Sequence, residues 1–192
     1  VLTNTFPAHI ERGSNVLNVL RIPYFPENSI EMLSGYDAVV LADTKEPMTF
    51  FGYEGVRGRL LAESQPRVEI ATARQDVVDA LEGLAEELNA PNALKTTSHR
   101  VGSNRNSSSL PTGKLTPEKA CLTLTSLQPE GAIIVDEGLT ASFSYYPMTA
   151  DLAAHSFITI AGGSIGYGMP CAIGAAIACP ERPVINLQAD GS

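Results

Sequence analysis

The sequence predicts an α/β protein in which parallel sheets are flanked by helices and two partial domains are joined by a polar linker. Three observations carry this prediction. Two short apolar runs bounded by turn residues, 36–41 and 67–71, have the character of buried parallel strands. Residues 76–88 place apolar side chains at helical spacing. Residues 91–114 are instead rich in Asn, Ser, Thr, Pro and Gly, which is typical of a linker.

The first predicted domain covers residues 1–90. Its two strands are followed by the helix over residues 76–88, and a capping box formed by Thr72 and Gln75 is expected just before that helix. The apolar side of the helix consists of Val77, Leu81, Leu84, Ala85 and Leu88. We expect this side to pack inward.

The second predicted domain covers residues 115–192. It opens with a helix signal at residues 116–118 (Thr-Pro-Glu), which combine a hydroxyl cap, a proline at the first helical position and an acid in the first turn. The apolar run over residues 132–138 is expected to be a buried strand that ends in acidic residues. A second helix, rich in Ala and Gly, is expected over residues 170–178.

The charge of the chain narrows the classes of partner. Its 21 acidic and 13 basic residues leave a formal net charge of −8. Nucleic acids and anionic membrane surfaces both reward a clustered basic surface, so neither is expected as a partner. Small molecules and other protein subunits remain as the expected classes of partner.

The cysteines and the apolar segments bear on the compartment. Cys121, Cys171 and Cys179 lack any C-x-x-C spacing and lie in apolar contexts, as buried thiols in a reducing compartment do. We therefore expect a cytoplasmic location. The uncharged stretch between His155 and Glu181 has the length of a membrane span, but several glycines and a proline interrupt it. A buried loop and helix explain it better.

The C-terminal residues carry the most specific pattern in the chain. The strand-like run VINLQ leads into residues 190–192 (Asp-Gly-Ser), which would leave a carboxylate and free backbone N–H groups at the carboxyl edge of a sheet. By itself, such a tripeptide is usually a turn. Upstream, however, residues 163–166 form a glycine-rich loop with one bulky aliphatic residue, and an aromatic-Gly-apolar-Pro turn follows at residues 167–170.

Taken in this order, residues 156–192 resemble the diphosphate-binding domain of thiamine diphosphate-dependent enzymes, especially the acetolactate synthase and benzoylformate decarboxylase group. Residues 115–192 resemble the N-terminal part of that domain, and residues 1–90 more loosely resemble the later part of the family's central domain. The resemblance implies a chain that lacks the family's first domain. One departure is Ala189, where the commoner form of the motif has glycine.

The resemblance implies thiamine diphosphate and Mg²⁺ as cofactors. Asp190 is the expected carboxylate ligand of Mg²⁺, and the family pattern places an Asn ligand farther along the chain. Gly191 and Ser192 match positions whose backbone N–H groups approach the diphosphate. A second loop matches one that donates hydrogen bonds to the other side of the diphosphate, although an ordinary strand-to-helix loop is the alternative. That loop consists of Glu137, Gly138, Leu139 and Thr140.

Within the glycine-rich loop, the implied cofactor contacts are Gly163, Ser164 and Ile165. Ile165 matches the bulky residue that wedges between the two rings of the coenzyme and holds it bent. The alternative for a lone isoleucine is an ordinary core position. The isolated histidines, His9, His99 and His155, are expected on the surface or in the core and not as metal ligands.

The function implied by the resemblance is a thiamine diphosphate- and Mg²⁺-dependent lyase or transferase that decarboxylates or ligates 2-oxo acids. In the family, the glutamate that activates the coenzyme comes from the first domain of a partner subunit. We therefore expect a homo-oligomer with its active site at a subunit interface, a catalytic glutamate outside this chain, and no activity of the chain alone; the catalytic residues of the chain itself are left open. FAD, which some relatives hold in the central domain, is left open. The competing hypothesis is a non-catalytic interaction or regulatory module that retains the fold.

Overall fold

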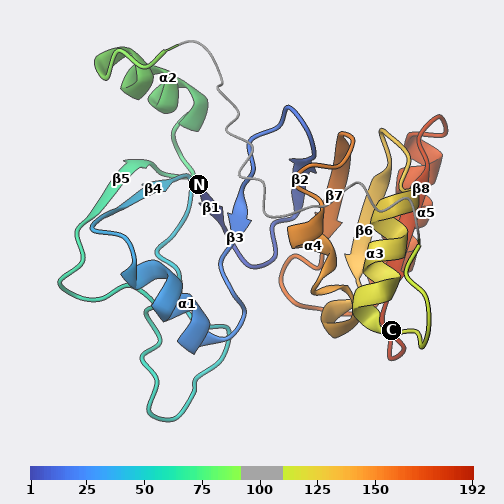
Figure 1. The fold of residues 1–192 in the computed structure, drawn as a ribbon. Coiled ribbons are helices and arrows are strands. Elements are labelled where there is room, and N and C mark those ends of the chain that lie inside the picture. The colour runs from blue at the N-terminus through green and yellow to red at the C-terminus, as the bar shows by residue number, and fades with distance from the viewer. Residues whose placement is uncertain (92–109) are drawn as a thin grey trace. The chain divides into compact units, whose positions relative to one another are not determined.

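The computed structural model describes residues 1–91 and 110–192, so most of the predicted linker, together with His99, lies outside the described residues. The chain divides into two compact units (Figure 1). We call them the C-terminal unit, which contains residues 6–20 and 110–192, and the N-terminal unit, which contains residues 2–5 and 21–91. The α/β class with parallel sheets is confirmed.

A four-stranded sheet forms the centre of the C-terminal unit. Its strands lie in the order β2-β7-β6-β8. Strands β7, β6 and β8 are parallel, whereas β2 pairs antiparallel with β7 at the edge. The strand bounds are β2 His9–Arg12, β6 Ile133–Glu137, β7 His155–Thr159 and β8 Val184–Gln188. The carboxyl ends of the three parallel strands therefore meet at one edge of the sheet.

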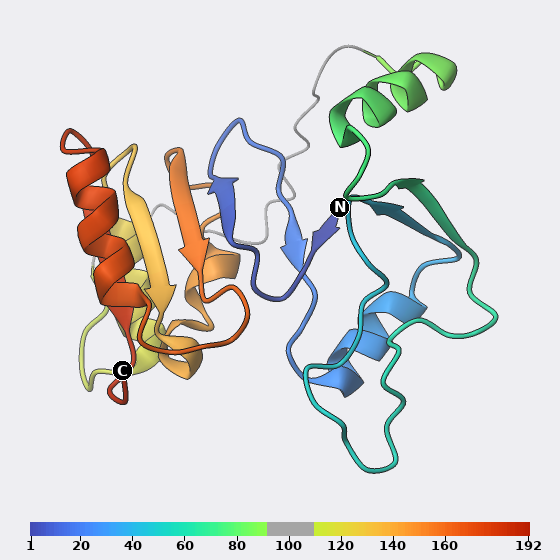
Figure 2. The same ribbon diagram turned by 180° about the vertical axis from the view of Figure 1, so that it is seen from behind.

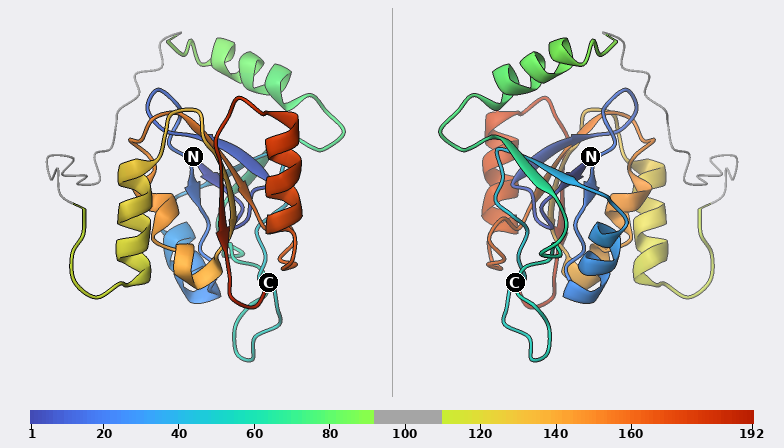
Figure 3. Two further views of the ribbon diagram at one scale, coloured as in Figure 1. Left: turned by 90° about the vertical axis from the view of Figure 1, so that its right-hand side faces the viewer. Right: turned by 90° about the vertical axis from the view of Figure 1, so that its left-hand side faces the viewer.

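Helices cover both faces of this sheet (Figure 3). Helices α3 (Pro117–Leu127) and α4 (Tyr145–Met148) lie on one face, and α5 (Gly168–Ala178) lies on the other. A 3-10 turn, Leu139–Ser142, follows β6. This is the layered arrangement expected when an apolar sheet must be shielded on both sides.

The core of the C-terminal unit lies between the sheet and helices α3 and α4. All five residues of β6 are buried, as its continuous apolar run predicts. Phe157 of β7 is fully buried and stacks on Tyr145, with 5.9 Å between ring centroids, while Tyr146 meets the same ring edge-on. Cys121 of α3 completes the cluster. Aromatic contacts of this geometry add to the stabilisation that burial provides.

The first strand of this sheet comes from the other end of the chain. Sequence analysis assigns all of residues 1–90 to one domain, but the structure places residues 6–20 in the C-terminal unit. The reason is the pairing of β2 with β7, in which Glu11 lies opposite Ser156 and Arg12 opposite His155. β7 pairs with β6 on its other side, and the pairing with β2 satisfies the backbone groups along its remaining edge.

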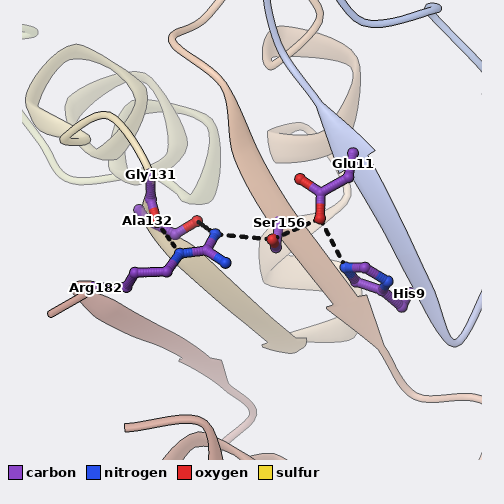
Figure 4. Close-up of polar contacts among 6 residues, drawn as sticks. All are labelled: His9, Glu11, Gly131, Ala132, Ser156 and Arg182. Atoms are coloured by element: carbon purple, nitrogen blue, oxygen red, sulfur yellow. Dashed lines mark hydrogen bonds and ion pairs between the residues drawn. The ribbon is translucent and has the colours of Figure 1, made fainter. Parts of the chain in front are cut away.

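Side chains reinforce this pairing near the amino end of the parallel strands (Figure 4). The Ser156 hydroxyl donates to Glu11 Oε1 at 2.7 Å, and the same oxygen lies 2.9 Å from His9 Nε2. From the other side, Arg182 donates to the Ser156 hydroxyl at 2.8 Å and to the carbonyl of Gly131 at 2.6 Å. The network therefore joins β2, β7 and the turn before β8.

The N-terminal unit is built on a pair of parallel strands, β4 (Val39–Ala42) and β5 (Arg67–Ala71). The bounds predicted for β5 are confirmed to the residue, and β4 begins three residues later than the predicted strand. The predicted burial is wrong for most of both strands, because Leu41 and Ala71 are buried whereas Val40 and Val68 are exposed. Helix α1 (Pro26–Ser34) contributes Leu33 to a small core with Leu60 and Leu61. Short strands β1 (Leu2–Thr3) and β3 (Leu20–Arg21) form a separate two-stranded sheet.

Helix α2 (Val77–Glu87) forms where the sequence predicts a helix, but its packing differs from the prediction. Asp76 caps it by accepting hydrogen bonds from the backbone N–H groups of Val78 and Asp79. None of its residues is buried, so the expected inward-facing side is exposed. Helical spacing predicts the face but not whether another element covers it.

The structure also bears on the predicted cap of α3, on the cysteines and on the apolar segments. Thr116 caps α3 by accepting from the Lys119 N–H at 3.2 Å, as predicted. The three cysteines are free thiols, and Cys121 is buried. Within residues 1–91 and 110–192, none of the helices combines the length and the apolar character that crossing a membrane requires.

Candidate functional site

Three loops with sequence-predicted site residues lie at one edge of the C-terminal unit. They follow the carboxyl ends of β6, β7 and β8, and the chain ends at the same edge (Figure 2). The loops contain residues 137–140, 163–165 and 190–192, in that order. Ligands of open α/β sheets bind beyond the carboxyl ends of the strands. The fold therefore brings all the predicted site residues to one sheet edge.

Glu137, the last residue of β6, is fully buried. Its carboxylate accepts hydrogen bonds from the backbone N–H groups of Gly166 and Gly168. Its predicted role was a direct contact with a diphosphate, but here its oxygens face groups of the protein itself. Desolvation raises the pKa of this carboxyl. The contributions of four hydrogen-bonding groups outweigh desolvation, so the pKa is lowered; these groups belong to Gly166, Ser192, Gly168 and Gln188.

The turn after Glu137 is tight. A Cβ atom at Gly138 would lie 2.9 Å from the Cβ of Ser142, so the close approach requires glycine. Leu139 has a positive φ of 44°, which is uncommon for a residue with a side chain. Leu139 and Thr140 are both exposed, whereas Gly138 is buried.

The glycine-rich loop after β7 is open. Gly162, Gly163 and Gly166 all have positive φ, and a Cβ atom at any of them would meet nothing within 4 Å. Ser164 is exposed, and Ile165 is 57% exposed. An isoleucine this exposed contradicts the alternative of an ordinary core position. The loop therefore presents one apolar side chain, flanked by accessible backbone, at the sheet edge.

Tyr167 anchors the end of this loop, a role that sequence analysis missed. Its hydroxyl lies 2.9 Å from the carbonyl oxygen of Asp136 and 3.3 Å from that of Ile158. Burial raises the pKa of Tyr167, so its hydroxyl remains a proton donor. The aromatic residue of the aromatic-Gly-apolar-Pro turn was the available signal, because a buried tyrosine needs a partner for its hydroxyl.

The third loop exposes Asp190, Gly191 and Ser192. Gly191 leaves open space where a Cβ atom would lie. The described residues contain no group of three or more His, Cys, Asp and Glu side chains that could hold a metal ion. Asp190 can therefore supply one carboxylate ligand, and the other ligands of a bound cation would be oxygens from elsewhere, such as water or phosphate.

These residues fit a phosphorylated cofactor bound through a divalent cation. Exposed glycines at two strand ends allow backbone N–H groups to approach an anion closely. The exposed carboxylate of Asp190, after β8, offers the oxygen ligand that Mg²⁺ prefers. His155, in contrast, is buried, with its Nδ1 2.8 Å from the carbonyl of Ala153, as expected for a core histidine.

Comparison with known proteins identifies the class. Residues 140–192 match the family described as thiamine pyrophosphate enzyme, C-terminal TPP binding domain, where thiamine pyrophosphate is another name for thiamine diphosphate. This part of the chain therefore belongs to the thiamine diphosphate-binding domains, and the chain is homologous to enzymes of the acetolactate synthase and benzoylformate decarboxylase group. The family resemblance predicted from sequence is confirmed.

The similar proteins are enzymes. A Mycobacterium tuberculosis protein named as an acetolactate synthase large subunit is 40% identical over 191 residues, which cover 100% of this chain and 36% of that protein. Benzoylformate decarboxylase of Pseudomonas aeruginosa is 34% identical over 80 residues, or 42% of this chain and 15% of the enzyme. The mitochondrial acetolactate synthase catalytic subunit of Saccharomyces cerevisiae is 54% identical over 39 residues, which cover 20% of this chain and 6% of the yeast protein.

This chain thus spans about a third of the length of the Mycobacterium tuberculosis relative and less of the others. No solved structure matches it.

Proposed function

We propose that this chain supplies the diphosphate- and Mg²⁺-binding part of a thiamine diphosphate-dependent enzyme that acts on 2-oxo acids. The reaction would be decarboxylation or carboligation, as in an acetolactate synthase, which makes the whole enzyme a lyase or transferase. The observation that carries the proposal is the convergence of an open glycine-rich loop, a tight turn and an exposed Asp190 at one sheet edge.

Each loop has a distinct task in this proposal. Asp190 would ligate Mg²⁺, and the N–H groups of Gly191 and Ser192 would hydrogen-bond the diphosphate. The turn after β6 would contact the diphosphate through Gly138, Leu139 and Thr140. The coenzyme, once bound, supplies the electron sink for the carbonyl chemistry.

On the other side of the site, Gly163, Ser164 and Ile165 would meet the organic part of the cofactor. The 57% exposure of Ile165 supports this assignment, because an exposed apolar side chain at a strand end is available for contact with a ring. The side chain would orient the coenzyme, and the backbone beside it would hydrogen-bond the pyrimidine.

Substrate class and assembly are proposed from the relatives. Those named benzoylformate decarboxylase and alpha-keto-acid decarboxylase favour a 2-oxo acid. We propose a homo-oligomer with the site at a subunit interface, and we expect no turnover by the 192-residue chain alone, which covers 36% of its Mycobacterium tuberculosis relative. The free thiols agree with a cytoplasmic location, which we also propose.

Calorimetric titration of this chain, extended to include the expected Asn ligand, with thiamine diphosphate and Mg²⁺ and then with a chelator, tests the proposal. We expect binding that depends on Mg²⁺. The variant Asp190→Asn should weaken it by at least about tenfold, since a neutral amide replaces the carboxylate ligand. Asp37→Asn is the matched control, because it removes an exposed acid of the N-terminal unit.

Two results of this titration would contradict the proposal. If the wild-type chain shows no Mg²⁺-dependent binding, the competing hypothesis of a non-catalytic interaction or regulatory module is favoured. If Asp190→Asn and Asp37→Asn bind equally well, Asp190 is not the metal ligand.

A further inference from the structure

Glu137 is a charged residue whose surroundings do not resemble those of a ligand-binding carboxylate. It ends the central strand β6 and is fully buried. The described residues contain no ion pair to Glu137. A buried carboxylate without a cation is costly unless several hydrogen bonds satisfy its oxygens. The partners of those hydrogen bonds therefore indicate what the residue does.

The hydrogen-bond partners lie in the segment that follows β7. The backbone N–H of Gly166 belongs to the glycine-rich loop, and that of Gly168 belongs to the first residue of α5. One buried side chain at the end of β6 thus holds the loop that follows the neighbouring strand β7.

The backbone around α5 is shaped for this contact. A Cβ atom at Gly168 would lie 2.8 Å from Glu137 Oε2 and 2.7 Å from Gln188 Oε1. The φ of Gly168 is not in the left-handed region, so glycine is needed here for space and not for backbone conformation. The absence of a side chain at residue 168 allows the carboxylate to reach the amides.

Backbone hydrogen bonds hold the start of the loop, where Gly163 N–H donates to the carbonyl of Ile160 at 2.9 Å. Its glycines face open space, and residues 161–166 are all exposed. On its C-terminal side, the Glu137 carboxylate and the Tyr167 hydroxyl provide the side-chain contacts among the described residues. The Gly166 N–H that Glu137 binds comes directly after Ile165. The position of Ile165 therefore depends on this hydrogen bond.

We propose that Glu137 is a positioning residue that sets the conformation of the glycine-rich loop and holds it beside the turn after β6, so that these two parts of the cofactor site keep a fixed relation. The effect of Glu137 on cofactor affinity rests on the proposed function. The ordering of the loop, in contrast, is a property of the chain without any ligand.

The chemistry of the carboxylate makes a sharp test possible. Its two oxygens only accept hydrogen bonds, and both loop partners are N–H donors. In Glu137→Gln one oxygen becomes an NH₂ group, which cannot accept from a backbone N–H. The variant keeps the shape of the side chain but leaves one buried donor unsatisfied. Glu181→Gln is the matched control, because it makes the same change at an exposed residue of the same unit.

Amide hydrogen exchange of the 192-residue chain, measured without ligand, is the first readout. In Glu137→Gln, the amides of Gly166 and Gly168 should exchange at least about tenfold faster than in the wild type. The core amides of Ile134 and Phe157 should keep their protection, which shows that the fold is intact. Unchanged exchange at Gly166 and Gly168 would overturn the proposal.

A second variant decides the case if Glu137→Gln does not fold. Gly168→Ala retains the carboxylate but places a methyl group against it. The displaced atoms are ends of flexible side chains, so the helix can remain while the hydrogen bond to Gly166 weakens. Faster exchange at Gly166 is expected, and wild-type exchange there would contradict the proposal.

Titration with thiamine diphosphate and Mg²⁺ is the second readout. We expect Glu137→Gln to bind at least about tenfold more weakly than Glu181→Gln. Equal affinities with a loosened loop would show that Glu137 does not position the cofactor site. Absence of binding by the wild type would instead contradict the proposed function, and the exchange data would still decide whether Glu137 orders the loop.

Discussion

The guanidinium carbon of Arg12 lies 3.9 Å from the centroid of the Tyr146 ring, although the two residues are 134 positions apart. Arg12 is 2% exposed. It donates hydrogen bonds to Thr149 Oγ1, to Asn18 Oδ1 and to the carbonyl oxygens of Val19 and Tyr146. The last residue of β2 is therefore built into the core of the C-terminal unit.

Replacing Arg12 with Met should destabilise this unit strongly. The apolar side chain would fill most of the volume but leave several buried acceptors without donors, at a cost of about 2–4 kcal/mol in the free energy of unfolding. Denaturant titration monitored by tyrosine fluorescence measures the change. The exposed Arg74→Met should stay within about 0.5 kcal/mol of the wild type. Equal stability of the two variants would mean that the hydrogen bonds of the Arg12 side chain do not stabilise this unit.

Gly13 follows β2, and its substitution separates steric crowding from backbone strain. Its φ is 109°, and a Cβ atom would lie 2.7 Å from the carbonyl oxygens of both Leu152 and Ala153. Gly13→Ala should cost at least about 3 kcal/mol, because strain and overpacking act together. Gly131 also has a positive φ but open space around its Cβ position, so Gly131→Ala should cost about 1–2 kcal/mol. Thermal unfolding of both variants provides the comparison, and similar losses would rule out the crowding.

His155 should make the protein less stable on mild acidification. Burial lowers the pKa of this histidine, and the nearby Arg12 lowers it further against opposing contributions from Ala153 and Glu11. As the pH falls below about 6.5, the usual histidine value, the unfolded chain therefore takes up a proton before the folded chain does. Stability that is complete above that pH is lost below it.

The measurement is the free energy of unfolding between pH 8 and pH 5 for the wild type and for His155→Gln. We expect a smaller loss in the variant below pH 6.5, and parallel curves above it, where the wild-type histidine is neutral in both states. A wild-type curve parallel to that of the variant over the whole range would show that His155 does not titrate differently on folding.

Ile165→Ala tests the apolar contact of the candidate site. Because Ile165 is 57% exposed, truncation should change the free energy of unfolding by less than about 0.5 kcal/mol. Affinity for thiamine diphosphate with Mg²⁺ should nevertheless fall by at least about tenfold. Ile173→Ala, at a 62% exposed position on α5, is the matched control and should bind like the wild type. A large loss of stability in Ile165→Ala would instead assign this residue to the core.

Local sequence determined those elements whose signals lie within a few residues. The apolar runs of β5 and β6 correspond to buried or partly buried strands, and Thr116 caps α3 as its hydroxyl and the following proline predict. The ordered series of glycine-rich loop, aromatic turn and Asp-Gly-Ser identified the family without any structural information, because each part is a contiguous motif.

The tertiary structure alone decided the contacts between distant segments. The pairing of β2 with β7 moved residues 6–20 into the C-terminal unit, and no element among the described residues buries the apolar side of α2. Glu137 has the same sequence context whether it faces a ligand or the amides of Gly166 and Gly168. Periodicity and caps are properties of neighbouring residues, whereas the partner of a buried charge depends on which loops the fold brings to the same sheet edge.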